Sequence, residues 1–442
     1  MVPPEKVLEN CTSKPAACQV CLTGDDPSAS IDIQFMRSIP GMELSELVSD
    51  AYDRLKKRVR RSELIYSHFY SDMLGIPLSF KCENLQRTGS FKIRGALNFM
   101  TSQPREKLKN GVITASAGNH AQGVAFSADL LGVAATVYMP EITPPQKVQA
   151  TRDYGAEVVL IGRNFDEACA AALAAQQKSG ALFVHPFDDE LVMAGQGTIS
   201  LEILEELPDL RTIIIPVGGG GLIAGMAAAL RERAPHVRII GVESTAAPSM
   251  SASFAAGKPT ERPVRVTLAD GIAVKRPGSK TVPIICSCVD EIVQVEEEDI
   301  ALAIVSLLEK TKILVEGAGA VTLAAVLNRR IPDLGGKTVC LLSGGNIDVR
   351  TISLVVERGL IAGGRYLKLV VELDDHPGAL ATLAENIAAT RANIFHITHD
   401  RRSKSLAIGR TDVSLELETR GYEHIKEIVG YLEGKGYRLT VV

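Results

Sequence analysis

The chain has 442 residues, of which 46% are hydrophobic and 23% are charged, and its formal net charge is -4. These values are typical of globular proteins, and the length suggests roughly two to four domains. The weak negative charge argues against binding to nucleic acid or to an anionic membrane. No apolar run reaches the roughly 18 residues of a membrane-spanning helix, and the N-terminus has neither a secretory nor a transit pattern, so we expect a cytoplasmic protein.

Residues 1–30 are polar and interrupted by Pro and Gly, and we expect an N-terminal extension without a readable function. Cys18 and Cys21 have the spacing of half a zinc site, and Cys11 offers a third ligand, but no nearby fourth ligand stands out. We therefore interpret these thiols as incidental. Cysteines in apolar runs, such as Cys340, are expected to be buried free thiols in a reducing compartment.

From residue 44 to 66 the apolar spacing predicts a helix, after which short β-branched runs alternate with longer helical patterns. Strands are predicted over 112–116, 135–140, 157–162, 182–186, 212–217, 237–243 and 338–342. Helices are predicted over 119–131, 144–154, 165–178, 191–206, 221–233, 297–311 and 317–328. Strands separated by helices of this length indicate βαβ units and parallel sheets. Two clusters of such units predict two α/β lobes with a cleft between them, the smaller lobe covering about residues 112–190.

Gly359, Gly363 and Gly364 interrupt this pattern and predict a hinge or linker that ends the first domain, 31–362. The residues that follow have a different order of elements. Strand 367–373 precedes a helix over 378–390, strands 393–400 and 411–418, a helix over 421–434 and strand 437–442. This βαββαβ order is the ferredoxin-like plan, so we expect a separate small domain over 367–442.

A lysine flanked by small residues lies in the run Thr88-Gly-Ser-Phe-Lys-Ile-Arg-Gly-Ala96. The amine of Lys92 can form a Schiff base with an aldehyde if its site lowers its pKa. The alternative is an ordinary surface lysine at the start of a helix. This run alone does not decide between the two interpretations.

A second run, Thr114-Ala-Ser-Ala-Gly-Asn-His-Ala-Gln-Gly123, falls where a predicted strand ends and a helix begins. Backbone N–H groups at such a junction form an anion site that suits a carboxylate. Asn119 can donate to a phenolate oxygen or to a substrate group, whereas His120 is interpreted as structural. The alternative is a capping turn in which Ser116 and Asn119 are ordinary caps.

The third run is Pro216-Val-Gly-Gly-Gly-Gly-Leu222, whose four glycines let the backbone wrap around a phosphate. A dinucleotide-binding loop is the rival interpretation, because Gly219, Gly221 and Ala224 fit its fingerprint and Glu243 ends the next strand. The fourth run, Leu341-Leu-Ser-Gly-Gly-Asn346, is a strand that ends in a turn. By itself it is only a strand exit.

Together, in this order and spacing, the four runs resemble the threonine and serine dehydratases, over about residues 31–360. These are pyridoxal-phosphate lyases with the tryptophan-synthase-β type of fold. The resemblance implies that Lys92 forms an imine with pyridoxal phosphate and that Phe91 packs against the cofactor. It also implies that Asn119 binds the phenolic oxygen, that Ser343 faces the pyridine nitrogen and that Gly271 lines the site. The implied phosphate loop is Gly218, Gly219, Gly220, Gly221 and Leu222, and the implied substrate loop is Ser116, Ala117, Gly118, Asn119 and His120.

Two residues refine the reaction that this resemblance implies. Ser343 cannot protonate a pyridine nitrogen as an aspartate would, so a long-lived carbanion is disfavoured and β-elimination is favoured over transamination. The related serine racemase has a second serine where this chain has Ala117, and Ala117 has no proton to give on the opposite face of the substrate. We therefore expect a lyase that converts L-threonine to 2-oxobutanoate and ammonia, with L-serine as a secondary substrate.

The racemase-type metal site is incomplete in this chain. Glu243 and the Ala247 carbonyl match it, but Ser249 stands where an acid is expected. A monovalent cation remains an open alternative. A nucleotide-dependent oxidoreductase would leave Lys92 without a use, and an inactive amino-acid sensor would have no need of the complete set of catalytic residues.

Residues 367–442 resemble an ACT domain, on the run Leu373-Asp-Asp-His-Pro-Gly-Ala-Leu380 and on Asn393-Ile394. The resemblance implies allosteric regulation by an amino acid that binds beside this turn, often across a pair of domains. The implied effector residues are Asp375, Pro377, Gly378, Asn393 and Ile394. The alternative is a dimerisation module without a ligand. The resemblance also implies a homodimer or homotetramer.

Overall fold

The computed structural model describes residues 42–400 and 407–442. The expected extension over 1–30, with Cys11, Cys18 and Cys21, lies outside these residues. Cys340 is fully buried, and burial raises the pKa of its thiol to about 12. In the part of the chain that the structure covers, no helix is long and apolar enough to span a bilayer.

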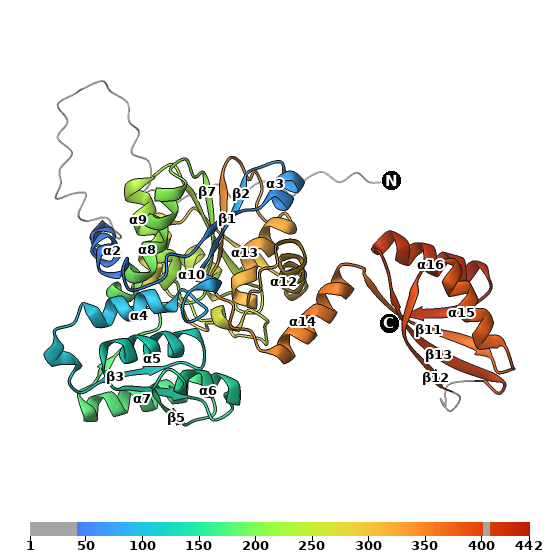
Figure 1. The fold of residues 1–442 in the computed structure, drawn as a ribbon, viewed down its shortest axis with the longest axis horizontal. Helices are drawn as coiled ribbons and strands as arrows, with labels where there is room; N and C mark the ends of the chain where they lie inside the picture. Colours follow the sequence, from blue (N-terminus) through green and yellow to red (C-terminus); the bar gives the residue numbers. More distant parts are fainter. Residues whose placement is uncertain (1–41, 401–406) are drawn as a thin grey trace, which may run out of the picture. The chain divides into compact units, whose positions relative to one another are not determined.

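The described residues form three β-sheets with helices packed on them (Figure 1). The α-helices are α2 (Met42–Leu55), α3 (His68–Leu74), α4 (Lys92–Thr101), α5 (Asn119–Leu131), α6 (Pro145–Arg152), α7 (Phe165–Ser179), α8 (Glu190–Glu206), α9 (Gly221–Arg233), α10 (Ser249–Ala256), α11 (Thr281–Cys288), α12 (Glu297–Thr311), α13 (Gly317–Leu327), α14 (Val349–Ala362), α15 (Ala379–Ala389) and α16 (Tyr422–Gly434). The 3₁₀ turns are η1 (Glu83–Leu85), η2 (Arg105–Leu108) and η3 (Asp270–Ile272). The strands are β1 (Leu64–Tyr66), β2 (Leu78–Cys82), β3 (Val112–Ala115), β4 (Ala135–Met139), β5 (Glu157–Leu160), β6 (Leu182–Phe183), β7 (Thr212–Pro216), β8 (Arg238–Ser244), β9 (Glu291–Val295), β10 (Thr338–Leu342), β11 (Tyr366–Asp374), β12 (Asn393–Asp400), β13 (Arg410–Glu418) and β14 (Arg438–Val441).

The largest sheet has the strand order β1-β2-β10-β7-β8-β9, and only β1 runs antiparallel to its neighbour. Successive side chains of a strand point to opposite faces, and β7 uses both faces for the core. Ile213 and Ile215 pack with α2, α8 and α9, whereas Ile214 packs with α12 and α13 on the other face. Figure 1 shows these two helical layers on either side of the sheet. The centre of β7, Ile213–Ile215, is therefore a continuous apolar run, as expected for a parallel strand covered on both faces.

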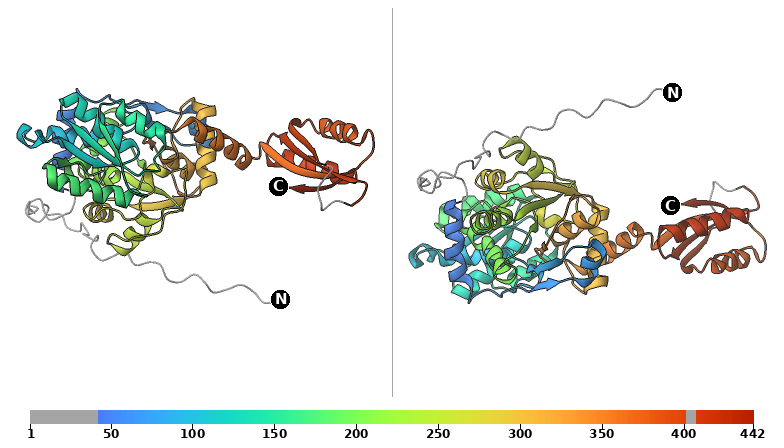
Figure 2. Two further views of the ribbon diagram at one scale, coloured as in Figure 1. Left: turned by 90° about the horizontal axis from the view of Figure 1, so that it is seen from below. Right: turned by 90° about the horizontal axis from the view of Figure 1, so that it is seen from above.

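A smaller sheet with the order β5-β4-β3-β6 is parallel throughout. Val112 and Val137 pack against α5 on one face, and Ile113 and Ala115 pack against α7 on the other. The views in Figures 1 and 2 agree that α5 and α7 cover opposite faces of this sheet. These strands and helices correspond to the smaller lobe expected from the sequence.

The third sheet is antiparallel, has the order β12-β13-β11-β14 and carries its own apolar core, which includes Leu369, Leu415 and Ile428. Together with α15 and α16 it has the expected βαββαβ order. The predicted fold class, a two-lobed α/β body with a ferredoxin-like domain, is confirmed.

Two predictions at the level of elements are wrong. The helix predicted over 44–66 ends at Leu55, and the residues from Leu64 form β1, because edge pairing with β2 satisfies their backbone. Gly359 is not in a linker but inside α14. A Cβ at Gly359 would lie 2.5 Å from Val305 Cγ2, so this glycine permits close packing of α14 on α12. The chain turns only afterwards, at Gly364, where φ is +63°.

Candidate active site

The four motif runs meet at one cavity of about 820 Å³. They come from the carboxyl ends of β3, β7 and β10 and from the start of α4, which is where ligands bind in open parallel sheets. All the residues expected to bind cofactor or substrate line this cavity: Phe91, Lys92, Ser116, Ala117, Gly118, Asn119, His120, Gly218, Gly219, Gly220, Gly221, Leu222, Gly271 and Ser343. The fold therefore brings together segments that are up to about 250 positions apart in the sequence.

Lys92 is the first residue of α4, and its side chain reaches into the cavity. Its Nζ donates to the carbonyl oxygen of Pro186 at 2.9 Å and lies 5.2 Å from the centre of the Phe91 ring. Burial lowers the pKa of Lys92 to about 8, although the charge of Glu316 opposes the shift. About a tenth of the amine is therefore unprotonated at pH 7, far more than for an ordinary lysine, and the unprotonated amine is the form that attacks a carbonyl.

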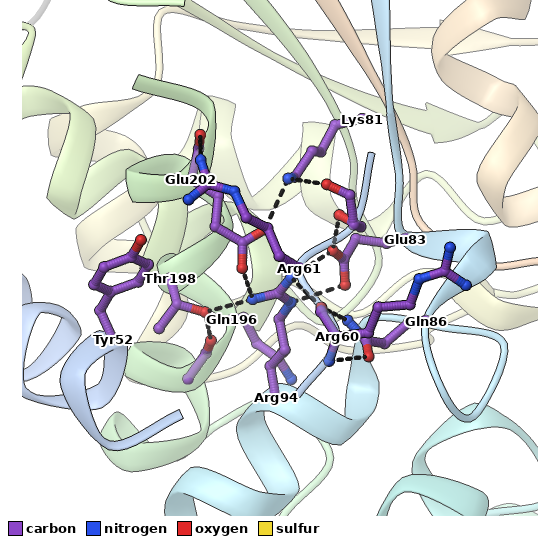
Figure 3. Close-up of polar contacts among 12 residues, drawn as sticks. Tyr52, Arg60, Arg61, Lys81, Glu83, Gln86, Arg94, Gln196, Thr198 and Glu202 are labelled. Atoms are coloured by element: carbon purple, nitrogen blue, oxygen red, sulfur yellow. Dashed lines mark hydrogen bonds and ion pairs between the residues drawn. The ribbon is translucent and has the colours of Figure 1, made fainter. Parts of the chain in front are cut away.

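A buried ionic network holds α4 in place two residues beyond Lys92 (Figure 3). Arg94 donates to both Glu83 oxygens at 2.8 and 2.9 Å and to both Glu202 oxygens at 2.6 and 3.0 Å. Lys81 donates to Glu202 at 2.7 Å. All four side chains are at most 4% exposed. Two cations balance two carboxylates, and the bidentate geometry fixes the start of α4 against β2, η1 and α8.

The glycine run Gly218–Gly221 has no space for side chains. A Cβ at Gly218 would lie 2.8 Å from Ile272 Cα, and a Cβ at Gly219 would lie 2.4 Å from the Phe187 ring. Gly220 has φ +96°, a conformation that favours glycine. Across residues 42–400 and 407–442, no protein group accepts from the N–H groups of these four glycines. Unpaired backbone donors at a helix start form an anion site.

Asn119 is held in one orientation by two neighbours that lie far away in the sequence. Its Nδ2 donates to Glu316 Oε1 at 2.7 Å, and its Oδ1 accepts from Asn346 Nδ2 at 2.8 Å. One N–H of the Asn119 amide therefore remains to serve a ligand in the cavity. Glu316 is 6% exposed, and burial raises the pKa of its carboxyl group to about 7.

Sequence reasoning gave no role to Glu316, Asn346 or the turn His185–Asp188. Asn346 is the last residue of the fourth motif run, but the sequence does not show that its side chain contacts Asn119. Glu316 stands between apolar residues just before a glycine-rich helix, and an acid in such a setting was the available signal.

Ser343 and His120 complete the cavity wall. Ser343 is 2% exposed at the end of β10, and its carbonyl accepts from Phe91 N at 3.1 Å, which ties the end of β10 to the start of α4. His120 is also 2% exposed, and its Nε2 lies 3.0 Å from the carbonyl oxygen of Val184. Burial, together with the nearby Lys92 charge, lowers the pKa of His120 to about 3. His120 is therefore neutral at physiological pH, which supports its interpretation as structural.

The residues considered for a cation lie outside this cavity. Glu243 is 1% exposed at the end of β8, and its two oxygens accept from Met250 N and Ser251 N, each at 2.9 Å. Gln294 Nε2 donates to it as well, at 3.1 Å. Over residues 42–400 and 407–442, no group of three or more His, Cys, Asp or Glu is arranged for a metal. Glu243 thus acts as a cap for α10, and a cation near Ala247 stays a prediction.

The effector residues expected in the ferredoxin-like domain lie on its surface in two separate places. Asp375, Pro377 and Gly378 form the exposed turn between β11 and α15. Asn393 and Ile394 begin β12, and the register Asn393–Glu418–Tyr366 sets them beside the opposite end of β11. Eight residues of strand separate the two places by about 26 Å. Within one domain the structure does not bring the two sets together.

The cavity suits a phosphorylated aldehyde. It offers a buried amine of lowered pKa, an aromatic ring beside that amine, four unpaired backbone donors and an amide N–H. The chain belongs to the family of pyridoxal-phosphate dependent enzymes, whose family model matches residues 55–344. The cofactor is pyridoxal phosphate. The rival dinucleotide-binding interpretation of the glycine loop is therefore abandoned.

Three known proteins show how specific this relationship is. An L-threonine ammonia-lyase of Geobacter sulfurreducens is 73% identical over 396 residues, which cover 90% of this chain and 98% of that protein. The structure of threonine deaminase isoform 2 from Solanum lycopersicum matches with a TM-score of 0.68 at 39% identity, over 72% of this chain and 88% of that one. The structure of maize serine racemase also has a TM-score of 0.68, at 34% identity, over 72% and 97% of the two chains.

Proposed function

We propose that this chain is a threonine ammonia-lyase that converts L-threonine to 2-oxobutanoate and ammonia by β-elimination. The observation that carries the proposal is the buried Lys92 amine, which shares one cavity with the unpaired donors of Gly218–Gly221 and with the Asn119 amide. The similarity to an L-threonine ammonia-lyase over 90% of the chain supports the choice of threonine.

The proposed mechanism assigns a task to each part of the cavity. Bound pyridoxal phosphate withdraws electrons from the substrate α-carbon and so makes its proton acidic. Lys92 would hold the cofactor through its amine, and the same amine, once free, would take the α-proton of the substrate. The N–H groups of the loop starting at Gly218 would hold the cofactor phosphate, and the Asn119 amide would donate to the phenolic oxygen. Loss of the α-proton and the β-hydroxyl together amounts to loss of one water, and addition of one water to the resulting enamine gives 2-oxobutanoate and ammonia.

The Lys92→Ala variant tests the assignment directly. It should lose the visible absorbance of the bound cofactor and release no measurable 2-oxobutanoate from L-threonine. In the wild-type protein, borohydride should bleach the absorbance and leave the adduct on Lys92, as read by peptide mass spectrometry. Normal turnover by Lys92→Ala, or an adduct on another lysine, would contradict the proposal.

Racemisation is the second candidate function, because maize serine racemase has an equally similar fold. Ala117 argues against it, since a racemase needs a proton-transferring group on each face of the substrate, and Ala117 offers none. Competition between L-threonine and L-serine tests the substrate preference, which depends on one methyl group worth only about 1–3 kcal/mol. A large preference for serine would overturn the choice of threonine.

Several features remain proposals beside this reaction. We propose that the ferredoxin-like domain is an ACT domain that binds an amino-acid effector at Asp375, Pro377, Gly378, Asn393 and Ile394. We also propose a cytoplasmic homodimer or homotetramer. Calorimetry with isoleucine, valine, serine and threonine tests the effector, and light scattering tests the assembly.

A further inference from the structure

The turn His185–Asp188 contacts both Lys92 and the glycine loop Gly218–Gly221. The Pro186 carbonyl accepts from Lys92 Nζ at 2.9 Å, and the next residue, Phe187, lies against the glycine loop. A Cβ at Gly221 would lie 2.6 Å from the Phe187 carbonyl oxygen. The residue after Phe187 is Asp188, whose side chain binds residues 279–281.

Both carboxylate oxygens of Asp188 accept hydrogen bonds from the backbone at the start of α11. Oδ2 accepts from Ser279 N at 2.9 Å and from Ser279 Oγ at 3.0 Å. Oδ1 accepts from Lys280 N at 2.8 Å and from Thr281 N at 3.2 Å. Hydrogen bonds to an ionised acceptor are stronger than those between neutral groups. A Cβ at Gly278 would lie 2.2 Å from Asp188 Oδ1, so the captured segment lies tightly on this carboxylate.

The captured segment in turn holds the carbonyl group of Gly219. Thr281 Oγ1 donates to this oxygen at 2.8 Å, and Gly278 N donates to it at 3.2 Å. In a trans peptide the C=O and the following N–H point in opposite directions. Fixing the Gly219 carbonyl against residues 278–281 therefore turns the Gly220 N–H the other way, away from that segment.

We infer that Asp188 is a positioning residue for the phosphate-binding loop and acts on it through the backbone of Ser279, Lys280 and Thr281. The inference rests on the proposed phosphate-binding role of Gly218–Gly221. The inferred role affects one part of the cofactor only, because the N–H groups of Gly218–Gly221 that Asp188 positions would bind its phosphate and no other group. Loss of Asp188 should weaken the binding of a phosphorylated ligand more than that of its dephosphorylated analogue.

The test compares pyridoxal phosphate with pyridoxal on the full-length apoenzyme. Asp188→Asn keeps the size of the side chain but presents an NH₂ group to backbone donors. We expect the dissociation constant for pyridoxal phosphate, from titration of the visible band, to rise about tenfold, whereas that for pyridoxal stays as in the wild type. The ³¹P resonance of the bound cofactor should also shift.

The neighbouring Asp189 gives a matched control. Its Oδ1 accepts from Val192 N at 3.0 Å and caps α8, with no bond to residues 278–281. Asp189→Asn keeps a side-chain oxygen that can cap α8, and it should leave the ³¹P resonance and both dissociation constants unchanged. If Asp188→Asn fails to fold, Thr281→Val, which removes only the hydroxyl that donates to Gly219, should still weaken pyridoxal phosphate binding selectively.

Two outcomes would overturn the inference. The first is that Asp188→Asn and Thr281→Val both bind pyridoxal phosphate with the affinity of the wild type. The second is that these variants lose affinity for pyridoxal phosphate and for pyridoxal to the same extent. Failure of the loop assignment itself would look different. In that case Gly219→Ala, whose Cβ meets the Phe187 ring, would not weaken phosphate binding, and the wild type would bind both ligands equally well.

Discussion

Glu316 is a buried carboxylic acid that forms no ion pair within residues 42–400 and 407–442, and this has a consequence for stability. The pKa of Glu316 is raised by burial from 4.5 to about 7 in the folded chain. Ionisation therefore costs the folded chain more than the unfolded one, and the stability contributed by the neutral acid is lost as pH rises from about 4.5 through 7.

Glu316→Gln should remove this dependence. Above pH 7 the variant apoprotein should be more stable than the wild type by up to roughly 3 kcal/mol, and this advantage should vanish by about pH 4.5. Urea unfolding of both proteins across this pH range measures the difference in their free energies of unfolding. Because all other groups titrate alike in the two proteins, their contributions cancel in this difference. A constant difference at every pH would show that the pKa of Glu316 is the same in the folded and the unfolded chain.

Ala117 supplies a second prediction for a single residue. Ala117→Ser places a hydroxyl in the substrate loop, where the related racemases carry a serine. We expect the variant to form D-serine from L-serine at a rate above that of the wild type, while elimination continues through Lys92. Chiral chromatography of the products reads both activities, and Ala117→Gly controls for a simple change in volume. If both variants form equal amounts of D-serine, the hydroxyl is not the source of the proton.

Motifs predicted the cavity residues well where chemistry demands one residue type at one spacing. Lys92 and the glycine loop are of this kind, because the proposed imine requires an amine and only glycine fits beside Phe187. Glu316 and Asp188 could not be found in this way. Glu316 acts on Asn119 from 197 positions away, and that proximity is a result of tertiary folding.

At the scale of elements, the ionic network around Arg94 should dominate the local stability of α4. Arg94→Met leaves Glu83 and Glu202 buried with only Lys81 to neutralise them, and removal of one partner from a buried ion pair costs about 3–5 kcal/mol. We expect a loss of this size in the free energy of unfolding at pH 7, measured with urea.

The companion variant distinguishes charge from packing. Arg94→Met combined with Glu83→Gln removes the buried carboxylate that Arg94→Met leaves without a cation, because Glu202 still pairs with Lys81. The double variant should be more stable than Arg94→Met alone, whereas Glu83→Gln alone should be less stable than the wild type. If the two losses simply add, the network is not coupled and the effect of Arg94 is one of packing.

The boundaries of elements were predictable where local signals mark them. α5 begins and ends at the predicted residues, and Gly132, with φ +64°, ends it in the left-handed region. β2 was missed although Leu78, Phe80 and Cys82 alternate with Ser79 and Lys81, which is a strand pattern. Lys81 is buried all the same, because it forms an ion pair with Glu202. α14 was missed because glycines at its end suggested a linker, although Gly359 is required for its packing.

At the scale of the whole molecule, the C-terminal domain should be separable from catalysis. Every residue that lines the cavity precedes position 349, and the domain over 366–441 has its own core and its own sheet. A chain cut after Gly364 should therefore still bind pyridoxal phosphate and deaminate L-threonine. What it should lose is any response to an amino-acid effector.

The position of the effector residues makes this prediction more specific. Asp375 and Asn393 lie at opposite ends of one sheet, so a single small amino acid reaches both only if they come from two different domains. Effector affinity should then rise with protein concentration as the domains associate, and Asn393→Ala should weaken binding without changing the fold. Calorimetry and sedimentation of the full chain, with and without ligand, measure both effects. If the effector binds with an affinity that does not depend on association, the site is limited to the turn at Gly378. If isoleucine, valine, serine and threonine all fail to bind, the domain serves dimerisation alone.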